Sequence, residues 1–161
     1  MTTGTPSRLH RVVLVDDDPE ILAALGRLTR GESYVGLPTQ DPGQALEWLR
    51  EGGISALVAD YQMEAMSGVA LLAEARAISP ATARILITGF AGDRDILAVR
   101  RTGLFTLFPK PWDDRELKRE LRDRLRNCEI ERMPEWLATA RIGPGGMATP
   151  RPGGPEPRAA R

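Results

Sequence analysis

The chain has 161 residues, the length of one ordinary domain with some excess. Its 22 Lys and Arg side chains balance its 22 Asp and Glu side chains, which excludes a strongly basic nucleic-acid binder and a strongly acidic disordered chain. No apolar run approaches the roughly 20 residues that cross a bilayer, and the polar first residues lack the apolar stretch of a signal peptide. These features predict a soluble cytoplasmic protein.

Short apolar runs alternate with amphipathic segments from residue 11 to residue 126. The apolar runs are typical of buried strands, and the amphipathic segments carry apolar residues at helical spacing. The expected strands are 11–15, 33–37, 54–59, 84–88 and 104–108, and the expected helices are 20–30, 42–50, 68–78, 93–101 and 112–126. Five repeats of a strand followed by a helix predict an α/β fold, a parallel sheet with helices on both faces.

The two ends of the chain differ in composition from this domain. We divide the chain into a disordered N-terminal arm, the domain, a short extra helix and a Pro/Gly-rich disordered tail, at residues 1–9, 10–128, 129–142 and 143–161. The extra helix is expected to begin at Pro134. The only histidine, His10, is expected to go with the arm, and Cys128, the only cysteine, has no metal-ligand neighbour in the sequence. Neither is a candidate site.

Polar side chains follow four of the predicted strands at their carboxyl ends. In chain order they are Asp16, Asp17, Asp60, Thr88 and Lys110, the last being one of only two lysines. The carboxyl ends of parallel strands meet at the edge of the sheet where such folds bind ligands. We therefore expect these five side chains to lie close together.

The residue types at this edge favour one chemistry. Crowded carboxylates repel one another unless a cation compensates them, and Mg²⁺ prefers oxygen ligands. A lysine and a hydroxyl suit an anion, so the set suits phosphoryl transfer to an aspartate nucleophile. Each residue alone also has a structural explanation, as a helix cap (which we expect for Asp18), a strand former or a surface charge. Their joint placement favours the functional interpretation.

Four segments resemble the receiver domain of two-component response regulators across nearly the whole predicted domain. They are Val13-Leu-Val-Asp-Asp-Asp-Pro-Glu-Ile21, Leu57-Val-Ala-Asp-Tyr-Gln-Met-Glu-Ala-Met-Ser-Gly68, Ile85-Leu-Ile-Thr-Gly89 and Phe108-Pro-Lys-Pro-Trp112. The resemblance implies a single flavodoxin-like (βα)5 domain with strand order 2-1-3-4-5. The Lys-Pro-Trp-Asp-Asp end also looks like a subgroup of receivers often joined to hydrogenase-regulatory or cyclic-dinucleotide output domains.

The resemblance implies a role for each candidate residue. Asp60 resembles the phosphoacceptor that takes a phosphoryl group from a kinase phosphohistidine. Asp16 and Asp17 resemble the acidic pair that holds Mg²⁺, Asp17 directly and Asp16 through water, with the backbone carbonyl of Gln62 as a further ligand. No other cofactor is implied, and the domain would be a phosphoacceptor rather than an enzyme with a separate substrate.

The resemblance also implies a switch. Thr88 resembles the hydroxyl that moves toward the phosphoryl group, and Lys110 resembles the lysine that pairs with it, followed by a cis bond to Pro111. Implied partners are a sensor histidine kinase or a phosphotransfer protein, and an effector that binds the face of strand 84–88, helix 93–101 and the last strand and helix, with a homodimer as an alternative. We expect residues 129–161 to be too short for a DNA-binding output domain, so nucleic acid is not an expected partner, and without a long apolar run a membrane is not expected either.

Three positions depart from the family pattern. Leu107 stands where receivers usually carry an aromatic residue, and Glu64 stands where the family often has proline, which predicts a less rigid loop. Phe90, two residues after Thr88, is bulky and apolar, and we hypothesise that it slows loss of the phosphoryl group. The mixed charges of the last helix predict a solvated helix with internal ion pairs.

Two alternatives remain open. A phosphatase of the haloacid dehalogenase type would use Asp16 as nucleophile and Asp18 as general acid, with Asp113 or Asp114 as the later acid. Against it, Asp60 would then be idle, and the two later acids open a helix instead of ending a strand. The other alternative is a receiver-like binding module that is never phosphorylated.

Overall fold

The computed structural model of the chain describes residues 9–132, 141–142 and 148–149. The chain divides into two compact units, residues 1–125 and residues 126–161. Within the described residues, no helix has the length and apolar character needed to cross a membrane. The first unit carries the five predicted strand–helix repeats.

A single parallel sheet forms the centre of the first unit. Its strands are β1 (His10–Val15), β2 (Tyr34–Thr39), β3 (Ile54–Asp60), β4 (Ala83–Thr88) and β5 (Thr106–Pro109). They lie in the order β2-β1-β3-β4-β5, and every neighbouring pair is parallel. This arrangement confirms the predicted flavodoxin-like order and brings the carboxyl ends of all five strands to one edge.

Five helices connect and cover the strands. They are α1 (Pro19–Leu28), α2 (Pro42–Glu51), α3 (Gly68–Ile78), α4 (Arg94–Arg100) and α5 (Asp114–Arg132). Short polar side chains cap the first four: Asp18, Asp41, Ser67 and Asp93 each accept a hydrogen bond from a main-chain N–H of the first turn. These caps fix where each helix begins after its strand-end loop.

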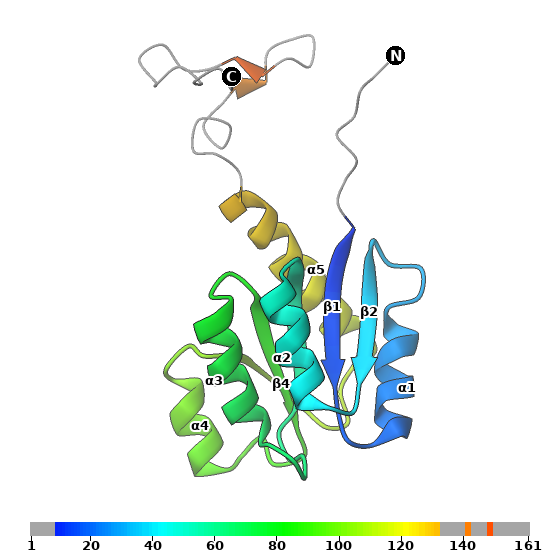
Figure 1. The fold of residues 1–161 in the computed structure, drawn as a ribbon, viewed down its shortest axis with the longest axis vertical. Helices are drawn as coiled ribbons and strands as arrows, with labels where there is room; N and C mark the ends of the chain where they lie inside the picture. The colour runs from blue at the N-terminus through cyan, green and yellow to red at the C-terminus, as the bar shows by residue number, and fades with distance from the viewer. Residues whose placement is uncertain (1–8, 133–140, 143–147, 150–161) are drawn as a thin grey trace. The chain divides into compact units, whose positions relative to one another are not determined.

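Both faces of the sheet are apolar, as expected for a sheet buried between two helical layers. Because side chains alternate along a strand, Val13 and Val15 of β1 pack with residues of α2, α3 and α4, whereas Val12 and Leu14 pack with α1 and α5. Figure 1 shows α2 and α3 lying side by side across one face. The core therefore fixes the strands and leaves their carboxyl ends free to carry polar groups.

Several element boundaries differ from the sequence prediction. His10 does not go with the arm: it begins β1, and its Nδ1 lies 2.8 Å from the Ser55 hydroxyl oxygen on β3. Strand β5 starts two residues later than expected, because Leu104 and Phe105 are buried in the core before strand pairing begins. Helix α5 continues to Arg132 because the first residue after position 126 that breaks a helix is Pro134.

The second unit contains the end of α5 and a pair of two-residue strands. Strand β6 (Arg141–Ile142) pairs antiparallel with β7 (Ala148–Thr149). This short pairing falls at the end of the segment expected as an extra helix and within the segment expected as a disordered tail. The predicted helix start at Pro134, the arm at residues 1–8 and the rest of the tail lie outside the described residues.

The charged side chains of α5 form ion pairs both within the helix and with Glu32 outside it. One internal pair is present, with Arg124 Nε 2.7 Å from Glu120 Oε1. Two other cations of α5 instead bind Glu32, in the turn between α1 and β2: Arg122 donates two hydrogen bonds of 2.8 and 2.9 Å, and Lys118 Nζ lies at 3.3 Å. The predicted internal pairing is therefore confirmed by one pair, and the pairs with Glu32 are additional, because the turn brings an acid beside the helix.

Candidate functional site

The first two acids lie in the loop that follows β1. The Asp16 N–H donates to the carbonyl of Thr39 at 3.4 Å, which extends the pairing of β1 with β2 by one residue. The Asp16 carboxylate turns inward, is only 2% exposed, and accepts a hydrogen bond from the Asp18 N–H at 2.9 Å. Asp17 is exposed. The two neighbouring acids therefore differ sharply in environment.

The third acid, Asp60, is the last residue of β3 and is 8% exposed. Carboxylate oxygens of Asp16, Asp17 and Asp60 all lie within 4.8 Å of one another. Asp60 Oδ2 also accepts the N–H of Gln62 at 3.1 Å, so the loop after β3 folds back on the carboxylate. The predicted convergence of the three acids is confirmed.

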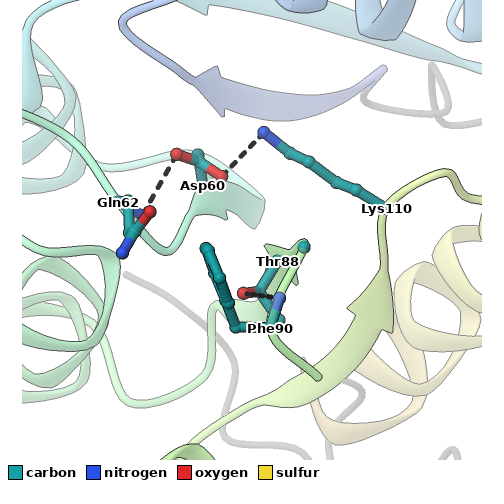
Figure 2. Close-up of a pocket in the computed structure, with 6 residues that line it drawn as sticks. Asp60, Gln62, Thr88, Phe90 and Lys110 are labelled. Atoms are coloured by element: carbon teal, nitrogen blue, oxygen red, sulfur yellow. Dashed lines mark hydrogen bonds and ion pairs between the residues drawn. The ribbon is translucent and has the colours of Figure 1, made fainter. Parts of the chain in front are cut away.

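Lys110 follows the carboxyl end of the edge strand β5, and its side chain contacts two of these acids. Its Nζ lies 2.8 Å from Asp60 Oδ1 and 3.2 Å from Asp16 Oδ2. Its main-chain N–H donates to the carbonyl of Thr88 at 2.7 Å, and the following bond to Pro111 is cis, as predicted. Figure 2 shows the lysine side chain reaching from the end of β5 to Asp60.

Thr88 and Phe90 line the same pocket as Asp60. The pocket has a volume of about 210 Å³ and is lined by Asp60, Gln62, Thr88, Gly89, Phe90 and Lys110. The Thr88 side chain is buried, and its hydroxyl oxygen accepts the N–H of Phe90 at 2.9 Å. Phe90 itself is 55% exposed, with its side chain beside Thr88 in Figure 2. A hydroxyl, a lysine and a carboxylate thus share one small cavity.

Burial and neighbouring charges shift the pKa values of Asp16 and Lys110 in this cluster, and both are raised. Burial raises the pKa of Asp16, and the charge of Asp60 raises it further, against the opposing effects of the Asp18 N–H and Lys110. Burial alone would lower the pKa of Lys110, but its hydrogen bond to Asp60 and the charges of both acids leave that pKa raised. The lysine is therefore held in its charged form, whereas the charge on Asp16 is only partly compensated.

The cluster fits a divalent cation. Three carboxylates offer oxygens within 4.8 Å of one another, and oxygens are the ligands that Mg²⁺ prefers. The buried Asp16 carboxylate carries a charge that burial and Asp60 destabilise, and an additional cation would relieve that cost. The exposed Asp17 leaves one side of the cluster open to solvent and to waters of hydration.

A glycine allows α3 to start directly against the site. The Gly68 N–H donates to the carbonyl of Tyr61 at 2.9 Å, and a Cβ added at Gly68 would overlap the carbonyl of Asp60 and lie 2.7 Å from Leu86 Cδ1. No other residue type leaves room for this approach. Gly68 therefore constrains the path of the chain directly after Asp60.

Some contacts at the site were not predicted. The main-chain N–H of Glu64 donates to Asp17 Oδ2 at 3.0 Å, a bond to the acid cluster that a proline at this position could not make. Gln40 Nε2 donates to the carbonyl of Asp17 at 2.9 Å. No sequence pattern identifies either bond, because both join loops that are distant along the chain. Leu107, the residue that stands where receivers usually carry an aromatic side chain, is half-buried and packs against the core.

The fold and this edge define a parallel α/β domain with an acid cluster and a lysine where its strands end, and comparison with known proteins identifies its family. The family model of the response regulator receiver domain matches residues 12–122, more than half of the chain. The chain therefore belongs to the response regulator receiver family of two-component systems, whose domains accept a phosphoryl group on an aspartate and interact with histidine kinases or phosphotransfer proteins.

Individual relatives are longer proteins. The chain is 29% identical over 125 residues to the transcriptional regulatory protein GlrR of Escherichia coli K12, covering 78% of this chain and 28% of that protein. It is 32% identical over 102 residues to the hydrogenase transcriptional regulatory protein HoxA of Cupriavidus necator, covering 63% of this chain and 21% of that protein. The chain thus spans less than a third of either relative.

Solved receiver domains share the fold over their whole length. The signal receiver domain of an HD domain-containing protein from Pseudomonas fluorescens Pf-5 has a TM-score of 0.68 and 30% identity, covering 75% of this chain and 98% of that one. A CheY-like receiver domain from Methanospirillum hungatei, 24% identical, has a TM-score of 0.70 with 76% and 98% coverage, which supports the fold.

Proposed function

We propose that this chain accepts a phosphoryl group from a histidine kinase phosphohistidine onto Asp60, in a Mg²⁺-dependent reaction, and that the resulting aspartyl phosphate switches a protein-binding face. One observation carries the proposal: Lys110 bridges Asp60 and Asp16 at 2.8 and 3.2 Å, inside a group of three acids, and both Asp60 and Lys110 line one pocket with Thr88. Packing of the core does not require these polar groups to converge.

The transfer is a displacement at phosphorus. An Asp60 oxygen forms the new O–P bond and the P–N bond to the imidazole breaks, with its electron pair staying on nitrogen; the imidazole leaves as the neutral base when its other ring nitrogen carries a proton. Lys110 would balance charge that develops on the phosphoryl oxygens, and the Thr88 hydroxyl would donate to one of them. Asp16, Asp17, Asp60 and the Gln62 carbonyl would hold Mg²⁺, which when bound neutralises charge on the phosphoryl group.

The switch follows from a change of partner at Thr88. In the structure described here its hydroxyl oxygen accepts the N–H of Phe90 at 2.9 Å. A hydroxyl that turns toward the phosphoryl group on Asp60 weakens this bond, and the loop between β4 and α4 is then free to rearrange. The face of β4, α4, β5 and the first part of α5 would present that change to an effector or to a second copy of the chain.

The phosphatase alternative finds no support at the residues it needs. Its general acid, Asp18, is occupied as the cap of α1, accepting the Glu20 N–H at 2.8 Å. Asp113 likewise accepts two main-chain N–H groups at the start of α5, at 2.8 and 3.0 Å. Asp60, which that mechanism leaves idle, is the acid that the lysine contacts most closely.

The test uses Mg²⁺, a small acyl phosphate donor and intact mass spectrometry. The wild-type chain and Asp16→Asn are compared with Asp60→Asn. We expect one added phosphoryl group on the wild type and none on Asp60→Asn, with slower addition to Asp16→Asn because a cation site is weakened. Turnover of the donor that survives Asp60→Asn and stops in Asp16→Asn would instead support the phosphatase. No modification of the wild type at any Mg²⁺ concentration would support the unphosphorylated binding module.

A further inference from the structure

Three loops of the sheet edge meet at Asp17. This residue lies in the loop between β1 and α1 and is the exposed member of the acid cluster. The Glu64 N–H, from the loop between β3 and α3, donates to its carboxylate Oδ2 at 3.0 Å. The Gln40 side chain, from the loop between β2 and α2, donates from Nε2 to its main-chain carbonyl at 2.9 Å. Both the side chain and the backbone of Asp17 are therefore held by neighbouring loops.

These two bonds matter because an exposed aspartate in a loop would otherwise turn freely. A carboxylate that must be ordered on binding a cation loses rotational freedom at that moment, and a bond already present removes part of that cost. The Glu64 N–H engages Oδ2 alone, so the second oxygen of Asp17 keeps its lone pairs for a ligand. An oxygen of Asp17 lies within 4.8 Å of oxygens of Asp16 and Asp60, so the tie is compatible with the converged cluster.

We propose that the Glu64 main-chain N–H and the Gln40 side chain are positioning groups that hold Asp17 ready for a divalent cation. This inference rests on the magnesium site of the proposed function. It assigns no role to the Glu64 carboxylate, which is exposed. The contribution belongs to a main-chain group that a proline at the same position would lack.

Magnesium itself is the probe, titrated into the metal-free full chain by calorimetry. Glu64→Pro removes the N–H, whereas Glu64→Ala removes only the carboxylate and keeps the N–H. Gln40→Ala removes the second tie, and Gln44→Ala is its matched control, because Gln44 bonds only to Glu47 on the surface of α2. We expect the Mg²⁺ dissociation constant to rise roughly three- to tenfold in Glu64→Pro and about two- to fivefold in Gln40→Ala. Glu64→Ala and Gln44→Ala should stay within about twofold of the wild type.

A second readout separates positioning from loss of structure. The rate of phosphorylation by a small donor is measured against Mg²⁺ concentration. In Glu64→Pro and Gln40→Ala the half-saturating Mg²⁺ concentration should rise, while the rate at saturating Mg²⁺ returns to that of the wild type. A folding defect would lower the saturated rate and the thermal midpoint together. Gln40 is an exposed side chain, so Gln40→Ala decides the question if Glu64→Pro does not fold.

The remaining outcomes test the positioning role, the magnesium site and the phosphoacceptor role separately. Unchanged or tighter Mg²⁺ binding in Gln40→Ala and in folded Glu64→Pro overturns the positioning role and leaves the proposed function intact. An equal loss in Glu64→Ala and Glu64→Pro also overturns it, since the carboxylate would then be responsible. A wild-type chain that binds no Mg²⁺ overturns the magnesium site and this inference with it. Mg²⁺ binding without phosphorylation removes the phosphoacceptor role but leaves the calorimetric comparison valid.

Discussion

Tyr34 carries a polar atom that the fold buries without satisfying. The side chain is 2% exposed at the start of β2, and its hydroxyl is the only buried side-chain N or O atom, among the residues that the structure describes, without a hydrogen-bond partner. Burial, with a smaller contribution from the charge of Glu32, raises the pKa of Tyr34 to about 12. The hydroxyl therefore costs stability at neutral pH and a charged phenolate would cost more.

Replacing Tyr34 by phenylalanine should be neutral or stabilising by up to about 1 kcal/mol near pH 7, because no hydrogen bond is lost. The unfolding free energy of the wild type should fall in the alkaline range. The folded pKa of about 12 lies above the ordinary 10.0, so the unfolded chain releases the Tyr34 proton first, and the stability present below pH 10 falls as pH rises from 10 toward 12. The difference between the two pKa values corresponds to roughly 2–3 kcal/mol in all.

Urea unfolding at increasing pH measures both effects. The wild type should lose stability more steeply than Tyr34→Phe once the pH passes 10. The other tyrosine, Tyr61, is half-buried, and Tyr61→Phe serves as the control. A Tyr34→Phe variant that is clearly less stable than the wild type at neutral pH would show that the hydroxyl is satisfied in solution.

Phe90 is the residue through which the lifetime of the proposed aspartyl phosphate can be tuned. It is 55% exposed and lines the pocket beside Asp60 and Thr88, so we expect it to limit the approach of water to the phosphoryl group. Phe90→Glu places a carboxylate that can orient and activate a water there, so we expect the phosphorylated lifetime to shorten at least about threefold. Leu9→Glu is the matched control, because Leu9 is 56% exposed and lies just before β1, at the opposite edge of the sheet. An unchanged lifetime in Phe90→Glu, measured by intact mass over time, would remove this role.

At the scale of elements, the close approach of α3 to the end of β3 constrains the site. A Cβ at Gly68 would overlap the carbonyl of Asp60 and crowd Leu86, so one of the two elements must move. Gly68→Ala should cost about 1–3 kcal/mol of unfolding free energy and also slow phosphorylation, because the displaced backbone is that of the proposed acceptor.

Gly26 offers the matched substitution within α1. A Cβ added there meets no atom within 4 Å, and alanine is the better helix former. Gly26→Ala should therefore be stabilising by up to about 1 kcal/mol. Chemical denaturation of both variants checks the contrast. Equal stability changes at the two positions would contradict the close approach at Gly68.

Elements with strong local signals were predictable. The buried strands end at polar residues, and helices α1 to α4 begin at capping side chains, of which Asp18 was expected from the sequence. The start of β5 could not, because Leu104 and Phe105 have the composition of a strand but pack into the core ahead of it. The ion pairs of Glu32 with α5 were also missed, since they depend on tertiary proximity.

At the scale of the whole molecule, one topological fact made the site predictable. Parallel strands place all their carboxyl ends at one edge, so Asp16, Asp60 and Lys110 could be expected together although they are far apart in sequence. The geometry around Asp17 was not predictable in this way. Its bonds to Gln40 and to the Glu64 N–H depend on how three loops fold against one another. The type of residue at a position does not reveal which acceptor its main-chain N–H will contact.

The central claim is that Asp60 is the residue that becomes phosphorylated. The most direct measurement treats the phosphorylated wild-type chain with borohydride, which reduces an aspartyl phosphate to homoserine, and locates the homoserine by peptide mass spectrometry. We expect homoserine at position 60 and nowhere else, and only when both Mg²⁺ and donor are supplied. Homoserine at position 16 or 17, or phosphorylated protein with unmodified Asp60, would contradict it.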